Sequence, residues 1–216
     1  MRGDKIIVEA HHRNAAKSIL HLILPEIEAS KGKYTLAVAG ESGSGKSETA
    51  TAIAEALADC DVPSIIFQQD DYFVHPPKTN DRVRREDIGW VGPQEVRLDL
   101  LDEHLQSFLG GAARIEKPLA IYEEDRITTE IAATADARVA IAEGTYTSLL
   151  SHANTKIFIA RNYLDTRAHR EKRKRDTSEL DPFIDDVLRI EHGIISAHRS
   201  RADIVIDKDY SVRKNG

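Results

Sequence analysis

Short apolar runs alternate with longer amphipathic stretches along most of this chain. Five runs have the length and residue types of buried strands, and they lie at residues 34–39, 62–67, 137–144, 155–160 and 202–206. The stretches between them carry apolar residues at helical spacing. Strands that alternate with helices favour a parallel sheet covered on both faces. We therefore expect an α/β fold of three layers around a mainly parallel five-stranded sheet.

Residues 1–33 precede the first strand and predict an N-terminal helical extension to a domain over 34–216. Apolar positions recur there at helical spacing: Ala16, Ile19, Leu20, Ile23 and Ile27. Pro25 should kink this helix or start a second one. We expect the helix to pack on the domain's own core, with a homodimer contact as the alternative. His11 and His12 are adjacent and share no helix face, so we expect surface histidines rather than a metal site.

The connections differ in character along the rest of the chain. Residues 74–93 are polar and too long for a tight turn, and a helix should follow near 94–109. Residues 114–129 predict a hairpin, which either closes over a substrate or lies at the periphery with a solvated acidic tip. A last helix should run over 181–198, and the polar residues 207–216 should fray.

The strongest motif lies between the first strand and the next helix. Residues 40–47 have the pattern G-x-x-x-x-G-K-S, and we call them the phosphate loop. Glycines let main-chain N–H groups approach an anion, and the following helix N-terminus favours negative charge. This pattern predicts a P-loop NTPase fold that binds a nucleoside triphosphate with Mg²⁺. The expected nucleotide-binding residues are Gly40, Ser42, Gly43, Ser44, Gly45, Lys46, Ser47 and Glu48.

Carboxylates follow two other predicted strands. Asp70 and Asp71 come after the second strand, and Glu143 ends the third. In an open parallel sheet, ligands bind off the carboxyl ends of the strands, so these groups should face the crevice beside the phosphate loop. A kinase needs a carboxylate at such a place to orient an attacking hydroxyl and accept its proton, and the alternative for Asp70 is an acidic loop residue without a catalytic role. Ser47, Asp70 and Glu143 are the candidates for placing Mg²⁺.

A dense basic stretch follows the fourth strand. Residues 162–182 begin as a predicted helix rich in arginine and lysine, in a chain whose formal net charge is −6. A charge run is usually a solvated helix face. Because guanidinium groups match phosphate oxygens, we favour a mobile helical lid in which Arg170 and Arg173 stabilise the charge that develops during transfer.

Net charge, the length of the apolar runs and the cysteine count indicate which partners and which cellular compartment to expect. The acidic balance argues against nucleic acid and anionic membranes as partners. No apolar stretch approaches the roughly 20 residues of a membrane span. Cys60 is the single cysteine of the sequence, which excludes an intrachain disulfide and suits a reducing cytoplasm. We expect a cytoplasmic protein with a small-molecule substrate.

Taken together and in this order, the motifs resemble those of the phosphoribulokinase/uridine kinase family of P-loop kinases over residues 34–206. The resemblance rests on the phosphate loop, the segment 69–73 (Q-D-D-Y-F), the strand that ends in Glu143-Gly144, the segment from Asp165 to the basic stretch, and the last strand. It implies transfer of the ATP γ-phosphate to a hydroxyl, with Asp70 as general base, Glu143 holding Mg²⁺ through water, and Arg170 and Arg173 in the lid.

The substrate segments depart from those of uridine kinases. Val91 stands where an aspartate should bind ribose hydroxyls, and Asp87 is the substitute that we consider. Tyr122 matches a base-contacting tyrosine, but Glu124 and Asp125 replace the histidine that should follow it. The acceptor is therefore not expected to be uridine. The substrate candidates are Asp71, Tyr72, Asp87, Tyr122 and Arg126.

The sequence thus predicts an ATP- and Mg²⁺-dependent kinase for a hydroxyl of a nucleoside, sugar or related metabolite. One alternative is an anionic acceptor, such as a sugar phosphate or adenylylsulfate, held by Arg82, Arg84 and Arg85. The other is a regulatory protein that binds ATP without transferring phosphate.

Overall fold

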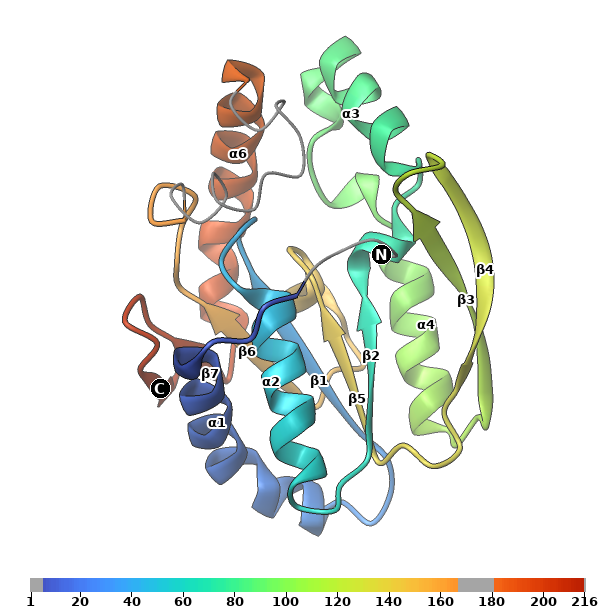
Figure 1. Ribbon diagram of the computed structural model, residues 1–216, viewed down its shortest axis with the longest axis vertical. Helices are drawn as coiled ribbons and strands as arrows, with labels where there is room; N and C mark the ends of the chain where they lie inside the picture. The colour runs from blue at the N-terminus through green and yellow to red at the C-terminus, as the bar shows by residue number, and fades with distance from the viewer. Residues whose placement is uncertain (1–5, 167–180, 216) are drawn as a thin grey trace.

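The computed structural model describes residues 6–166 and 181–215. A six-stranded sheet lies at its centre, in the order β2-β5-β1-β6-β7-β8 (Figure 1). Its strands are β1 (Tyr34–Gly40), β2 (Ser64–Gln68), β5 (Val139–Glu143), β6 (Thr155–Ile159), β7 (Ile204–Ile206) and β8 (Val212–Lys214). The first five in sequence run parallel, which confirms the predicted α/β class.

The sixth strand corrects the expectation that residues 207–216 fray. Strand β8 pairs antiparallel with β7, so it closes one edge of the sheet. A tight turn precedes it, in which the Asp207 carbonyl accepts from the Tyr210 N–H at 2.9 Å and Tyr210 adopts a φ of 66°. Residues 207–216 are mostly polar, so the hydrophobic pattern did not predict this strand of three residues.

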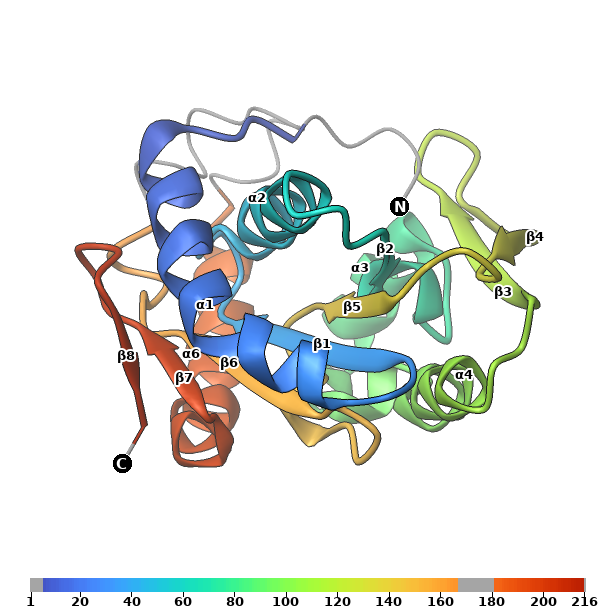
Figure 2. The same cartoon turned by 90° about the horizontal axis from the view of Figure 1, so that it is seen from below.

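Helices cover both faces of the sheet (Figure 2). Helices α1 (Ala10–Ala29) and α2 (Lys46–Ala58) bury one apolar cluster against the sheet, and α4 (Leu98–Leu109) and α6 (Pro182–Ile195) contribute to a second on the opposite face. Adjacent residues of a strand point to opposite faces, and β1 accordingly sends Val38 into the first cluster and Ala39 into the second. The three predicted layers are present.

Helix α1 belongs to the core of the domain. Its apolar stripe, including Ile19, Ile23 and Ile27, lies in the same buried cluster as α2 and β1. The helix continues through Pro25, so no second helix starts there. His12 is 1% exposed, so the expectation of a surface histidine was wrong for this residue. Its Nδ1 accepts the backbone N–H of Glu9 at 3.1 Å and caps the helix.

The polar connections form an arm beside the sheet. Strands β3 (Arg114–Ile121) and β4 (Arg126–Ala133) pair as the predicted hairpin. The segment 74–93 contains a helix that the sequence pattern did not predict, α3 (Pro77–Glu86), which begins with proline at its first position. The short 3₁₀ turns are η1 (Gln69–Tyr72), η2 (Ile88–Trp90), η3 (Pro93–Glu95), η4 (Thr147–Leu149) and η6 (Ser196–Arg201).

Candidate active site

The phosphate loop connects β1 to α2 and has the geometry of an anion site. Gly45 precedes the helix with a φ of 96°, a left-handed conformation that other residues rarely adopt. A β-carbon there would also lie 3.1 Å from Nε2 of His12, so α1 forms part of the loop's surroundings. The Ser44 hydroxyl is buried and has no hydrogen-bond partner among the described residues. A buried hydroxyl of this kind, beside a helix N-terminus, fits a bound phosphate.

A hydrogen bond joins the phosphate loop to the end of β5. The Ser47 hydroxyl donates to Oε1 of Glu143 at 3.0 Å. Glu143 is 5% exposed, and its burial together with the nearby charge of Asp70 raises its pKa to about 7. A hydroxyl and two carboxylates are oxygen donors of the kind that Mg²⁺ prefers, and a cation here would offset the cost of burying their charge. These residues fit a magnesium ion.

Close packing brings η1 against the end of β5. Gly144 adopts a φ of 159°, and a β-carbon on it would lie 2.2 Å from the Cβ of Gln69. The side chain of Gln69 in turn accepts the backbone N–H of Tyr146 at 2.7 Å. The glycine after Glu143 thus allows Asp70 and Asp71 to lie beside the magnesium candidates.

Glu41 of the phosphate loop contacts the first residues of the predicted lid and the helix that follows it. The buried carboxylate of Glu41 accepts the backbone N–H of Tyr163 at 2.8 Å and contacts Nδ1 of His192 at 2.7 Å. Lys46 donates to the Glu41 carbonyl at 2.9 Å. Arg170 and Arg173 fall outside the described residues, so their predicted role in the lid stays a prediction.

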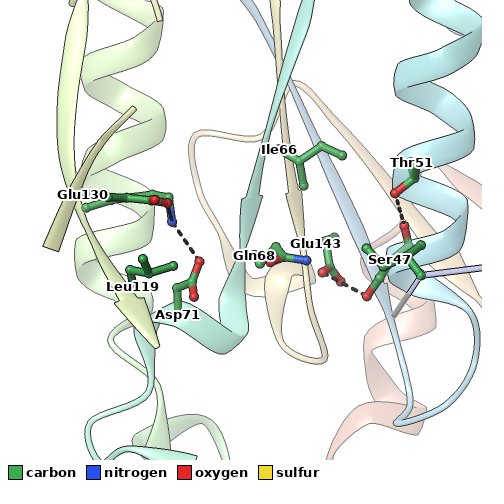
Figure 3. A pocket seen from close by; sticks show the side chains of 10 residues that line it. Ser47, Thr51, Ile66, Gln68, Asp71, Leu119, Glu130 and Glu143 are labelled. Carbon is green, nitrogen blue, oxygen red and sulfur yellow. Dashed lines mark hydrogen bonds and ion pairs between the residues drawn. The ribbon is translucent and has the colours of Figure 1, made fainter. Parts of the chain in front are cut away.

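A cavity of about 360 Å³ lies between α2, the end of β2 and the hairpin, and we call it the hairpin cavity (Figure 3). It begins at Ser47 and Glu143 and extends to β3 and β4. Its described lining consists of Ile6, Ser47, Thr51, Ile66, Gln68, Asp71, Lys117, Leu119, Glu130 and Glu143. The volume lies within the range of small-molecule sites.

The two aspartates of η1 have different surroundings. Asp70 is partly exposed, and its charge acts on Glu143. Asp71 is buried; its Oδ1 accepts the backbone N–H of Ala120 at 3.0 Å and its Oδ2 pairs with the ammonium of Lys117 at 2.8 Å. Asp71 therefore fastens the hairpin to the sheet and also lines the hairpin cavity.

The remaining substrate candidates lie away from this cavity. Tyr72 is fully buried in the second core cluster, where its hydroxyl lies 2.9 Å from Nδ1 of His104, so its position does not support a substrate contact. Asp87 is exposed and caps η2 by accepting the Gly89 N–H at 2.9 Å. Tyr122 lies under the ammonium of Lys78, and Arg126 pairs with Glu124 at the exposed end of the hairpin.

Two of the three arginines of α3 are engaged by carboxylates. Arg84 pairs with the buried Glu95 at 2.6 Å and with Glu191 at 3.4 Å, which connects α3 to α6. Arg85 pairs with Asp81 and with Asp181, each at 2.8 Å. Two of the three cations that the sequence offered for an anionic acceptor, Arg84 and Arg85, thus hold the arm to α6. The third, Arg82, is exposed and donates to the Thr79 hydroxyl at 2.9 Å.

Sequence reasoning missed Lys117, Glu130 and Glu41. The motif pattern leaves Glu41 unspecified, so nothing in it marked that residue. Lys117 and Glu130 lie on opposite strands of the hairpin as direct register partners. Each residue is a charged side chain at a strand position where the alternation calls for an apolar one, and this could have marked them in the sequence. The register of the hairpin was needed to show that they pair.

Comparison with known proteins agrees with this geometry. The sequence pattern of the phosphoribulokinase/uridine kinase family matches residues 35–208. A curated relative, the bifunctional alpha-galactosidase/sucrose kinase of Mediterraneibacter gnavus, is 27% identical over 194 residues. The match covers 84% of this chain but only 21% of that protein's length.

Two solved structures share the fold. The putative fructose transport system kinase of a Silicibacter species has a TM-score of 0.63 at 20% identity, over 90% of this chain and 98% of its own. The possible uridine kinase of Bacillus stearothermophilus has a TM-score of 0.63 at 16% identity, over 89% of this chain and 97% of its own. Among the described residues, no helix has the length and apolar character required to span a membrane.

Proposed function

The chain belongs to the phosphoribulokinase/uridine kinase family, and from that premise we propose that it transfers the γ-phosphate of ATP to a hydroxyl group of a small sugar-like metabolite. As a member of this family it is a small-molecule kinase, a phosphotransferase that acts on hydroxyl groups. The names of its relatives include a sucrose kinase, a putative fructose transport system kinase and a possible uridine kinase. The sucrose kinase relative, at 27% identity, supports a sugar as the acceptor.

The observation that carries the proposal is the junction of the phosphate loop with the strand ends. Ser47 and Glu143 are hydrogen-bonded, and Asp70 lies close enough to raise the pKa of Glu143. A candidate phosphate-binding loop and a candidate magnesium site thus meet at the edge of a cavity that a small molecule fits, and the candidate base Asp70 acts on Glu143 from nearby.

The chemistry follows from the positions of these residues. Main-chain N–H groups of the loop and Lys46 hold the polyphosphate, and Ser47 and Glu143 would hold Mg²⁺, which neutralises phosphate charge when bound. Asp70 orients the acceptor hydroxyl and accepts its proton. The hydroxyl oxygen forms a bond to the γ-phosphorus as the bond to the β,γ-bridging oxygen breaks, and ADP leaves.

A screen for acceptor-dependent ADP release tests the proposal directly. The purified chain, with ATP and Mg²⁺, should release ADP when neutral sugars are added, and mass spectrometry should find the phosphorylated sugar. The variant Asp70→Asn should bind ATP normally but lose turnover by about 10²- to 10⁴-fold, the usual contribution of a positioned base. Turnover close to that of the unmodified chain would remove Asp70 from this role.

The compartment and the assembly state are part of the same proposal. The single cysteine, Cys60, is exposed and free, which supports a reducing cytoplasm. The predicted homodimer stays a prediction. The apolar stripe of α1 that suggested it is buried against α2 in this chain.

A further inference from the structure

We propose that the ion pair between Lys117 and Glu130 on the hairpin is the acceptor-recognition element of this kinase, and that it selects a neutral aliphatic polyol against phosphorylated acceptors and nucleosides. The inference rests on the proposed function, because it assigns the second substrate of the same site. It is carried by the register of the hairpin and by the lining of the hairpin cavity.

Register places the recognition groups on the inner face of the hairpin. Lys117 on β3 lies directly opposite Glu130 on β4, and Nζ of Lys117 lies 2.8 Å from Oε1 of Glu130. Leu119, two residues along β3, faces the same way and lines the same cavity. Glu116 directly precedes Lys117 on β3, so its side chain points to the opposite, outward face of the hairpin, where it is exposed. The hairpin therefore turns one charged and apolar face toward Ser47 and Glu143.

The hydrogen-bonding state of this face suits hydroxyl groups. Lys117 directs its ammonium to Asp71 and to Glu130, each at 2.8 Å, so both contacts neutralise its charge. Glu130 uses Oε1 for this pair, and a carboxylate accepts hydrogen bonds at both oxygens, so Oε2 can accept from a hydroxyl. The side chain of Glu130 is 39% exposed, which makes it reachable from the cavity.

Charge disfavours an anionic acceptor. On the hairpin side of the cavity, the carboxylates of Asp71 and Glu130 face the one ammonium of Lys117, and the excess charge is negative. Glu143 adds a further carboxylate toward the metal side. Of the α3 arginines that an anionic acceptor would need, Arg84 and Arg85 are held by Glu95, Glu191, Asp81 and Asp181, and the exposed Arg82 is not among the described residues that line the cavity. A phosphate on the acceptor would meet like charge in a partly desolvated site.

The lining also disfavours a nucleobase. None of the ten described residues that line the cavity is aromatic, and the apolar ones are the aliphatic Ile6, Ile66 and Leu119. Stacking on an aromatic ring is a main source of affinity for a base. An aliphatic polyol needs acceptors and donors for its hydroxyls and aliphatic contacts for its carbon skeleton, and Glu130, Gln68 and Leu119 supply these.

The test compares two charge reversals on the same hairpin. In Glu130→Lys the recognition pair is replaced by two cations, whereas Glu116→Lys makes the same charge change on the outward face and serves as the control. We expect Glu130→Lys to raise the KM for the neutral sugar about tenfold or more, as loss of a charged hydrogen bond should, with the KM for ATP unchanged. It should also improve the ratio of turnover with sugar phosphates to turnover with neutral sugars. The milder Glu130→Gln should raise the sugar KM in the same direction.

The outcomes separate the inference from the proposed function. Calorimetry with a non-hydrolysable ATP analogue measures acceptor binding alone. If the chain binds neutral sugars without transferring phosphate, the proposed function fails and the assignment of the cavity stands. If the chain transfers phosphate to sugars but prefers phosphorylated ones, or if Glu130→Lys behaves as Glu116→Lys does, the assignment is overturned and the proposed function stands. If the chain prefers nucleosides, the assignment is overturned and only the transfer of the ATP γ-phosphate to a hydroxyl stands.

Discussion

The two halves of the active site are built in different ways. The phosphate loop comes from eight consecutive residues, 40–47, and it offers mainly backbone N–H groups and a helix N-terminus. The hairpin cavity comes from side chains of α2, β2, η1 and the hairpin, among which Asp71, Lys117 and Glu130 are brought together over long sequence separations. The backbone shape of the loop requires particular residues, such as the glycine at position 45, so few substitutions preserve phosphate binding. The lining of the hairpin cavity consists of separate side chains, so one substitution can change which acceptor binds.

The largest effect is expected from the phosphate half. Lys46→Met removes the side-chain cation of the loop, and kcat/KM should fall about a thousandfold, as for loss of one preorganised stabilising group. Because this half serves every acceptor, the loss should be the same for each sugar tested by ADP release. Lys17→Met, on the exposed side of α1, is the matched control and should retain normal turnover. A loss that differs between acceptors would contradict the division into two halves.

The acceptor half depends on how the hairpin is fastened. Asp71→Asn removes the buried carboxylate that Lys117 and the Ala120 N–H share. We expect about 2 kcal/mol less free energy of unfolding in urea, the scale of a buried hydrogen bond to a charged group, together with a higher KM for the acceptor. The exposed Asp59→Asn should leave both quantities nearly unchanged. Destabilisation with an unchanged acceptor KM would show that the hairpin does not contribute to the acceptor site.

A smaller effect should come from the contact between the halves. Glu41 accepts from the Tyr163 N–H and contacts His192, so it ties the phosphate loop to the segments that flank the basic stretch. Glu41→Gln keeps the shape but loses the charge, and kcat should fall about fivefold, since a charge-assisted hydrogen bond becomes a neutral one. Steady-state kinetics with Glu55→Gln, at an exposed helix position, gives the reference. Equal kcat values for the two variants would rule out this role of Glu41.

The smallest effect concerns the support beneath η1. His104 contacts the Tyr72 hydroxyl, and burial lowers the pKa of His104 from its ordinary value of 6.5. Below that value the unfolded chain takes up a proton that the folded chain resists, so this residue removes stability as the pH falls. In His104→Gln, the free energy of unfolding should decline less steeply between pH 7.5 and 5.5 than in the unmodified chain. The exposed His21→Gln is the control for replacing a histidine outside this contact, and a slope in His104→Gln equal to that of the unmodified chain would contradict the assignment.

The same contrast explains what the sequence could predict. The apolar runs and the phosphate loop predicted the layers, the parallel strands and the position of Ser47 and Glu143, because local pattern determines each of them. Helix α3 and strand β8 were not predicted, since both have polar sequences and depend on tertiary contacts. The recognition pair was missed because it requires the register between two strands.

The resemblance to the family predicted the substrate candidates less well than the phosphate loop. Tyr72 lies at a position that the motif aligns, and Asp87 was considered because Val91 stands at the aligned position, but in the fold Tyr72 lies in the core and Asp87 caps η2. A motif transfers well where backbone geometry imposes it, as at Gly45. A residue role is not predicted well by a motif where the side chains differ from those of the family, as at Glu124 and Asp125 on the hairpin. The predicted roles of Arg170 and Arg173 await the same comparison.

The docking of helix α1 is coupled to the binding of a nucleotide by the phosphate loop. Its buried stripe packs on α2, and its first turn carries His12 to the neighbourhood of Gly45. A ligand that binds only the intact loop draws the equilibrium toward chains in which α1 is docked. Bound nucleotide would thus protect the N-terminal helix from proteolysis. Conversely, a substitution that destabilises the docking of this helix would lower the affinity of the loop for nucleotide.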